Sequence, residues 1–217
     1  MKYLRKFETE ADVNISVVPN VVLVGDTGKV IYNVLNGVYI QHIDGSLYTT
    51  DEWTAGGFTN DQANGVAVGS GAVKFVIAKE DVSKSTWSSD ENNAVNGVML
   101  TADESSAKKD YAGVENTNRI MDAYTSGTAA HAAVNYIFPS GAKGYLPALG
   151  ELQIVRENMT AIKNAMTLIG GTWFITTKYW ASTQHSVSNA WVYDWDYKWP
   201  SYAKKTQSLY VRPFTTL

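Results

Sequence analysis

Residues 179–214 read YWASTQHSVSNAWVYDWDYKWPSYAKKTQSLYVRPF, and five aromatic residues occupy every second position, at Trp191, Tyr193, Trp195, Tyr197 and Trp199. Successive side chains of an extended strand point to opposite faces, so this spacing predicts five rings on one face of a sheet. Such a face is either part of the core or a binding surface, because aromatic rings supply much contact area at little conformational cost. The spacing alone leaves both interpretations open.

Composition limits the class of protein. The chain has 217 residues, of which 45% are hydrophobic and 18% charged. This composition predicts a folded protein with a substantial core. The net charge of −3 argues against a nucleic-acid partner, and the lack of cysteine excludes disulfides, thiolate metal sites and cysteine nucleophiles. No stretch reaches the roughly 18 apolar residues that span a bilayer, and no signal-peptide pattern opens the chain. We therefore expect synthesis in the cytoplasm and no membrane insertion.

The first sixty residues predict β-hairpins. Residues 21–33 (VVLVGDTGKVIYN) and 38–50 (VYIQHIDGSLYTT) each pair two β-rich runs across a turn, the second through Asp44-Gly45. Two short hairpins are seldom stable by themselves, so we interpret residues 1–57 as a β-hairpin attachment module. Residues 52–65 are polar and glycine-rich, as expected of a junction, and residues 58–217 form the predicted main domain.

Helices are predicted in the middle of the chain. Thr128 is a candidate N-cap, and residues 149–169 have apolar side chains three or four apart before Gly170-Gly171 end the run. That run is either one long helix or two short helices broken near Asn158. Strands precede and follow these helices without βαβ alternation. The order predicts an α+β domain whose final strands rejoin the first strands.

No catalytic constellation is visible. His42, His131 and His185 are far apart and lack metal-ligand spacing, and the glycine runs match no nucleotide-binding motif. Asp194 and Asp196 are predicted to share a strand face, as solvated acids rather than a calcium site. We expect a protein that is not an enzyme and that needs no metal or cofactor.

Four segments carry a resemblance to a known family. They are GYLPALGEL at 144–152, TAIKNAMTLIGGT at 160–172, YWASTQHSVSNAWVYDW at 179–195 and KKTQSLYVRPF at 204–214. In this order they resemble the C-type-lectin-like domain of variable proteins diversified by retroelements in phages and gut bacteria, which shares its broad fold with formylglycine-generating enzymes. Residues 75–81, 96–113 and 116–124 resemble the front half of that domain, so the likeness covers about residues 60 to 217. Residues 4–14 resemble the leader of phage tail or virion proteins of this type.

The resemblance implies that residues 191–202 form a hairpin, with Asp196, Tyr197 and Lys198 at a turn where the family usually has a glycine. It assigns a buried framework to Tyr179, Trp180, Ser182, Thr183, Trp191, Val192, Trp195, Lys205, Tyr210, Val211 and Arg212. It assigns outward, ligand-binding positions to His185, Val187, Asn189, Tyr193, Asp196, Tyr197, Lys198, Trp199, Ser201, Tyr202, Lys204, Gln207 and Leu209.

The expected function follows from this resemblance and from two absences. Formylglycine chemistry needs cysteine, and the EPN, QPD and WND triplets of calcium-dependent lectins do not occur in the chain. The resemblance implies a non-enzymatic display protein of the phage-tail or surface-adhesin type, located on a virion or cell surface, that binds a cell-surface protein or glycan receptor. The alternative is a structural virion or fimbrial component whose aromatic face packs on another subunit. An enzyme with a cleft between helices and final strands is the weakest alternative.

Overall fold

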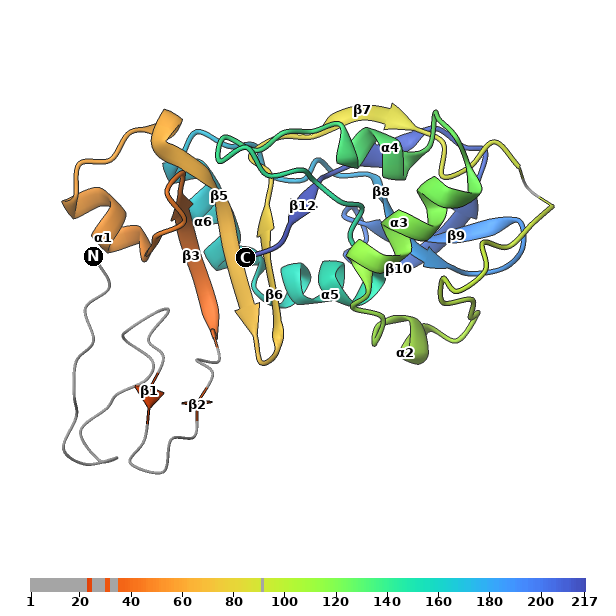
Figure 1. The fold of residues 1–217 in the computed structure, drawn as a ribbon, viewed down its shortest axis with the longest axis horizontal. Helices are drawn as coiled ribbons and strands as arrows, with labels where there is room; N and C mark the ends of the chain where they lie inside the picture. The colour runs from red at the N-terminus through yellow and green to blue at the C-terminus, as the bar shows by residue number, and fades with distance from the viewer. Residues whose placement is uncertain (1–22, 25–29, 32–34, 91) are drawn as a thin grey trace.

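The computed structural model describes residues 23–24, 30–31, 35–90 and 92–217, in which two five-stranded sheets lie toward opposite ends of the molecule (Figure 1). The first sheet has the strand order β12-β6-β5-β3-β4, with β3 at Gly37–His42, β4 at Leu47–Tyr48, β5 at Ala63–Ser70, β6 at Val73–Ile77 and β12 at Phe214–Thr215. The second has the order β10-β9-β8-β11-β7, with β7 at Val82–Ser85, β8 at Lys178–Gln184, β9 at Asn189–Asp194, β10 at Trp199–Lys204 and β11 at Leu209–Val211.

In the described part of the chain, two helical segments interrupt the early strands between β4 and β5, and five helices separate β7 from β8. They are α1 at Thr50–Ala55, the short 3₁₀ helix η3 at Asn60–Gln62, α2 at Glu104–Ala107, α3 at Gly113–Ala123, α4 at Ala129–Val134, α5 at Leu149–Glu157 and α6 at Met159–Leu168. Strand β12, at the end of the chain, pairs antiparallel with β6. The predicted α+β class is confirmed, and the final strand rejoins the early strands as expected.

The hairpin built on Asp44-Gly45 is present. Strands β3 and β4 pair antiparallel, and Gly45 has a φ of +90°, a conformation that favours glycine. In the hairpin predicted at residues 21–33, the strands β1 (Leu23–Val24) and β2 (Val30–Ile31) also pair antiparallel. The turn between β1 and β2, and the leader-like residues 4–14, lie outside the described residues.

The predicted module boundary at residue 57 does not coincide with a break in packing. Strand β3 pairs with β5 along its length, from Gly37 opposite Gly69 to His42 opposite Ala63. Trp53 of α1 is buried in the same core cluster as Ile162 of α6. Residues 37–57 therefore belong to the sheet and core of the main domain. Local hairpin patterns gave no sign of this, because the pairing partner of β3 lies more than twenty residues further along the chain.

The helical middle follows the sequence pattern. Residues 149–169 form two helices, α5 and α6, which meet at Asn158, and the Asn158 amide donates a hydrogen bond to the carbonyl oxygen of Ile154. The Thr128 hydroxyl oxygen accepts the backbone N–H of His131 and caps α4. None of the helices described combines the length and apolar character needed to cross a bilayer.

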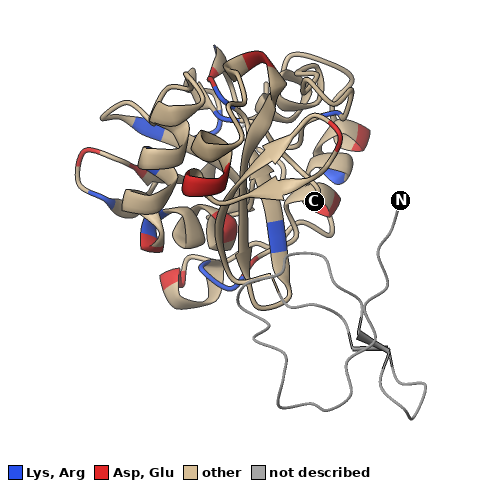
Figure 2. Cartoon of the chain, turned by 90° about the vertical axis from the view of Figure 1, so that its left-hand side faces the viewer, with Lys and Arg blue, Asp and Glu red and all other residues tan. Residues whose placement is uncertain are grey.

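Both faces of the second sheet are covered. Tyr179, Trp191 and Tyr193 pack into one cluster with α5 and α6, whereas Trp180 and Val192 pack into another with side chains of α3 and α4. Strand β10 is an edge strand, and it contains Pro200, a residue that sheets tolerate at their edges. Figure 2 shows acidic and basic residues interspersed along the ribbon on the side that faces the viewer.

Candidate binding surface

The aromatic run of the last quarter forms a hairpin rather than one strand. Strand β9 ends at Asp194, a turn covers 195–198, and β10 returns with Trp199 opposite Asp194. Trp191 and Trp195 are buried, whereas Tyr197 and Trp199 are 79% and 57% exposed. The prediction that all five rings share one face of a strand is therefore wrong, because the turn at 195–198 leaves some of the rings in the core and others on the surface.

The framework residues lie where the resemblance implied. Ten of the eleven are buried, and Tyr210 is half-buried. Arg212 shows how they hold the sheet: its Nε donates to Asp81 Oδ1 at 2.6 Å, and its guanidinium lies over the Phe174 ring. Tyr179 donates its hydroxyl to the other oxygen of Asp81 at 2.7 Å. This network connects Tyr179 of β8 and Arg212, which follows β11, to Asp81 in the link between β6 and β7.

The predicted outward residues divide into three groups. Val187, Asp196, Tyr197, Lys198, Trp199, Tyr202, Lys204 and Gln207 are exposed, and His185, Asn189, Ser201 and Leu209 are half-buried. Tyr193 is the exception and is corrected here: it is 1% exposed and packs on Trp195 with ring centroids 4.6 Å apart. Its position in β9 faces α5 and α6, so it belongs to the core.

One side of the hairpin carries a ring stack. His185 stacks on Tyr202 and meets Trp191 edge-on, with ring centroids 4.9 Å apart for the second pair. The Trp191 indole N–H donates to the carbonyl oxygen of Thr101 at 2.8 Å. Burial lowers the pKa of His185, and its buried Nδ1 has no hydrogen-bond partner among the residues that the structure describes. The stack thus rests on the core at Trp191 and ends in solvent at Tyr202.

A second group surrounds Trp199. Its indole N–H donates to Glu104 Oε2 at 2.9 Å, and the Lys108 ammonium lies 4.3 Å from its ring centroid. Glu104 and Lys108 form an ion pair across α2. The only polar side-chain atom of Trp199 is therefore already bonded within the chain. Lys108 covers part of the ring, and the exposed part can contact a partner.

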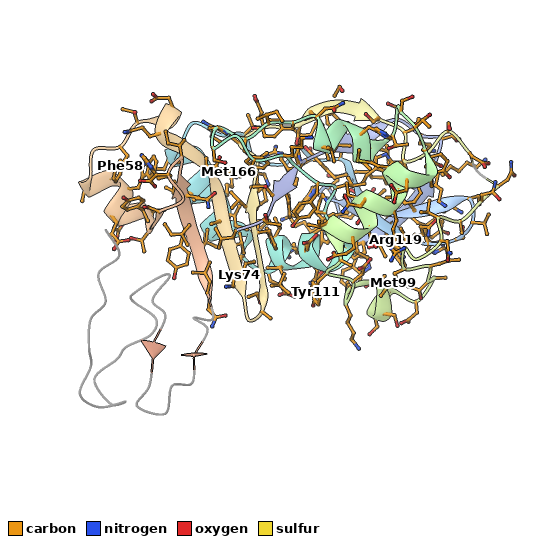
Figure 3. All side chains as sticks on the ribbon, in the orientation of Figure 1. Phe58, Lys74, Met99, Tyr111, Arg119 and Met166 are labelled. Carbon is orange, nitrogen blue, oxygen red and sulfur yellow. The ribbon has the colours of Figure 1, made fainter. Side chains whose placement is uncertain are left out.

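Met99 and Leu100 are two further exposed apolar residues, on a segment beside the end of β8, and the sequence prediction missed both. The backbone of this segment bonds to the end of β8, since Gln184 N–H donates to the oxygen of Met99 and Thr101 N–H to the oxygen of Gln184. Figure 3 shows Met99 near α2, toward the end of the molecule that carries the second sheet. We call the set the aromatic surface: Met99, Leu100, His185, Val187, Tyr197, Trp199 and Tyr202. Three consecutive apolar residues, Val98–Leu100, in an otherwise polar stretch were the available signal.

The aromatic surface concentrates the exposed apolar side chains. Among the residues described, twelve large hydrophobic side chains are exposed, and six of them are in this set. The set lies on the β9–β10 hairpin, on the connection between β8 and β9, and on residues 99–100, which the Leu100–Gln184 bridge holds beside the end of β8. Exposed apolar groups that gather in one part of a protein mark interaction sites.

Buried polar groups beneath the surface hold it in place. The Gln184 side chain bonds to the backbone of Val95 in both directions and to the oxygen of Val98. The Lys205 ammonium donates to Gln184 Oε1 at 2.8 Å and lies over the Trp87 ring. Burial lowers the pKa of Lys205 to about 8. These contacts fix the segment that leads into Met99, so the surface is supported rather than carried by a free loop.

The turn of the hairpin is made without glycine. Lys198 has a φ of +58°, and it is the only non-glycine residue with positive φ among those described. Asp194 accepts the backbone N–H of Asp196 at 3.1 Å, so the two predicted acids form a turn contact rather than a shared strand face. In the described part of the chain, no three His, Asp or Glu side chains gather closely enough to hold a metal ion.

Comparison with known proteins identifies a solved structure with a similar fold but no family to which the chain can be assigned. No family model and no curated protein matches the chain. Among solved structures, a fimbrial protein from Bacteroides ovatus ATCC 8483 superposes with a TM-score of 0.60 over 85% of this chain, at 14% sequence identity. The matched region is 49% of that protein, so the chain spans about half of its length. At this identity the likeness shows a shared fold alone.

Proposed function

We propose that this protein is a non-enzymatic component of a surface appendage and that the aromatic surface is the face by which it binds another subunit. The observation that carries the proposal is the exposure of Tyr197, Trp199 and Tyr202 on a hairpin whose framework is anchored in the core. Rigid aromatic anchors of this kind dominate the binding energy of protein interfaces. The fold shared with a fimbrial protein supports the appendage setting.

The chemistry of the surface favours a protein partner. Met99, Leu100 and Val187 add aliphatic area to the rings, and the Trp199 indole N–H is already bonded to Glu104. Aliphatic area is buried well by another protein, whereas a sugar needs polar groups directed at its hydroxyls.

Receptor recognition by the same surface is the second candidate. Its support is the composition: Tyr, Trp, His, Ser and Asn side chains together form the kind of surface that antibody-like binding sites use. Under this candidate the protein is a display protein of a cell surface or virion, and the partner is a cell-surface protein or glycan.

The C-type-lectin-like assignment and the link to retroelement-diversified proteins are also proposals. The return of β12 to β6, the paired helices α5 and α6 and the final hairpin are compatible with such a domain. A reverse-transcriptase gene beside a near-copy of the last coding segment would support the variable-protein link, and its absence from the genomic neighbourhood would argue against it.

Incorporation into appendages tests the proposed function. Cells of the source organism would express the full chain, or its Trp199→Ser/Tyr202→Ser variant, and their sheared appendages would be examined by mass spectrometry. Loss of the variant, with retention of an Ile137→Ser control altered at another exposed apolar residue, is the expected result. Normal incorporation of the variant with loss of cell attachment would favour receptor binding instead. Absence of the unmodified chain from appendages would contradict the appendage setting.

A further inference from the structure

Asparagine is followed directly by glycine three times in the chain, at Asn36, Asn64 and Asn96. In this dipeptide the backbone nitrogen of the glycine can attack the side-chain carboxamide carbon of the asparagine, because glycine has no Cβ to obstruct the approach. The attack needs a carboxamide that can turn and a peptide group that can rotate. The fold removes both freedoms at two of these positions and leaves them at the third.

Asn64 is restrained on every side. It is 1% exposed and lies in β5, the central strand of the first sheet. Its amide donates to Gln41 Oε1 at 2.5 Å, and its side-chain oxygen accepts the Ser140 N–H at 2.9 Å. A Cβ added to Gly65 would lie 2.4 Å from the carbonyl oxygen of Ile77, so the next peptide group has no room to rotate. Reaction at Asn64 therefore requires the sheet to open.

Asn36 is exposed, but hydrogen bonds hold it. Its side-chain oxygen accepts the Gly71 N–H at 2.9 Å, and its carbonyl oxygen accepts the Tyr39 hydroxyl at 3.2 Å. The next residue, Gly37, begins β3 and pairs with Gly69 of β5. The carboxamide and the neighbouring peptide group are both fixed to the sheet, so Asn36 should react slowly in the folded protein.

Asn96 has neither restraint. Asn96 and Gly97 are exposed at the centre of a turn in which the Val98 N–H donates to the carbonyl oxygen of Val95 at 3.4 Å. Gly97 has a φ of +78°, which fits its place in this turn. Among the described residues, none forms a hydrogen bond with the Asn96 carboxamide or with the Gly97 N–H. The carboxamide and the attacking nitrogen are therefore both free of hydrogen bonds to the rest of the described chain.

A cation lies beside this turn. A Cβ built on Gly97 would lie 2.6 Å from Nη1 of Arg119, so the guanidinium of this α3 residue covers the glycine. Arg119 forms no ion pair with any residue that the structure describes. A nearby positive charge favours the loss of the proton from the Gly97 nitrogen, which makes that nitrogen a better nucleophile, and it offers an ion partner to a carboxylate at position 96.

We propose that Asn96 is a site of spontaneous covalent modification, at which the folded chain converts asparagine into aspartate and isoaspartate. The Gly97 nitrogen attacks Asn96 Cγ, and the new N–C bond closes a succinimide ring. The bond between Cγ and Nδ2 breaks, and ammonia leaves with the proton that the Gly97 nitrogen has lost. Water then opens the ring at either carbonyl. One opening gives aspartate, and the other gives isoaspartate, in which the backbone continues through the side chain.

The modification changes the segment that supports the aromatic surface. Gln184 Nε2 donates to the carbonyl oxygens of Val95 and Val98, which flank the turn. Isoaspartate adds a methylene to the backbone between these two carbonyls and so disturbs the spacing that Gln184 bridges. Met99 follows directly in the chain. The isoaspartate form should therefore hold Met99 less firmly, whereas the aspartate form keeps the original backbone length.

Ageing of the full chain, both folded and in guanidinium chloride, tests the proposal. Both samples would be kept in mildly alkaline buffer, quenched with acid and digested with pepsin, and fragmentation mass spectrometry would quantify deamidation at each asparagine. In denaturant the three sites should react at similar rates. In the folded chain Asn96 should stay within about tenfold of its denatured rate, whereas Asn36 and Asn64 should slow on the order of 100-fold or more, because they wait for local opening. Equal rates at the three folded sites, whether fast or slow, would overturn the proposal.

Two variants isolate the part of Arg119. Arg119→Gln should slow deamidation of Asn96 severalfold in the folded chain and leave its rate in denaturant unchanged, since the guanidinium is held beside Gly97 only by the fold. Lys163→Gln, which removes an exposed cation on α6, should leave both rates unchanged. A folded rate that is the same in Arg119→Gln and in the unmodified chain would overturn the part assigned to the guanidinium.

Discussion

The imidazole ring of His185 stacks on the phenol ring of Tyr202, with centroids 4.0 Å apart and planes 21° from parallel. Because His185 also contacts the buried Trp191, the exposed ring is supported from below by the core. A supported ring loses little conformational freedom when a partner covers its other face. We therefore propose that the exposed rings of the hairpin bind the partner and that the buried residues beneath them stabilise the fold.

Alanine substitutions at Tyr197, Trp199 and Tyr202 should leave the fold nearly intact. Each ring is more than half exposed, so its loss should change the unfolding free energy by about 1 kcal/mol or less. Trp199 should have the largest effect of the three, since it also loses the Lys108 and Glu104 contacts. Thermal melts of the single variants check this, and a loss of several kcal/mol would place these rings in the core.

Tyr193 and Tyr197 form a matched pair four residues apart. Tyr193→Ala should cost about 3–5 kcal/mol, the usual range for a buried aromatic, whereas Tyr197→Ala should be nearly neutral. Trp180→Ala, Trp191→Ala and Trp195→Ala should behave like Tyr193→Ala, because all three indoles are buried. Urea unfolding measures the difference, and equal effects at positions 193 and 197 would contradict the division between core and surface.

Tyr193 also shows where sequence reasoning stops. Alternation of side chains along a strand distinguishes buried from exposed positions only when one face of the sheet is in contact with solvent. Both faces of β9 are covered, so Trp191, Val192 and Tyr193 are all buried and the alternation carries no information about exposure. Local signals were more informative: the Thr128 cap was predicted, and of the two alternatives left open for residues 149–169 the structure has two helices that meet at Asn158.

A chain that begins at residue 58 should not fold, contrary to the module boundary expected from the sequence. It would lack strand β3, which pairs with β5, and Trp53, which fills the core beside α6. A chain that begins at residue 35 keeps both and should fold. Circular dichroism and thermal melts of the two chains check this. A cooperative melt of the shorter chain would show that residues 1–57 are a separate module after all.

Lys198 holds the turn in a left-handed conformation that costs a non-glycine residue roughly 1 kcal/mol or more. Lys198→Gly should therefore leave stability unchanged or raise it by up to about 1 kcal/mol, because relief of strain competes with the greater freedom of glycine in the unfolded chain. Lys198→Val should destabilise, since β-branched residues tolerate positive φ poorly. Equal stability of the two variants would show that the turn relaxes.

The aromatic surface could be predicted only in part. The exposed hairpin residues were predicted through the family resemblance, which assigned them outward positions, whereas the alternation of rings alone left core and surface open. Met99 and Leu100 were not predicted, because their place beside β8 depends on backbone bonds between residues about 85 positions apart, at Gln184. The Gln184 and Lys205 contacts that fix this segment are likewise long-range, and no local spacing indicates them.

Hydroxyl-radical footprinting of Tyr197, Trp199 and Tyr202 tests the central proposal most directly. The rings would be oxidised in the isolated full chain and in purified appendages of the source organism, with Tyr111, exposed elsewhere, as the internal control. We predict rapid oxidation of all three in the isolated chain and strong protection in the appendage, with Tyr111 unchanged. Equal oxidation of the three rings in both states would show that the aromatic surface is not a subunit contact.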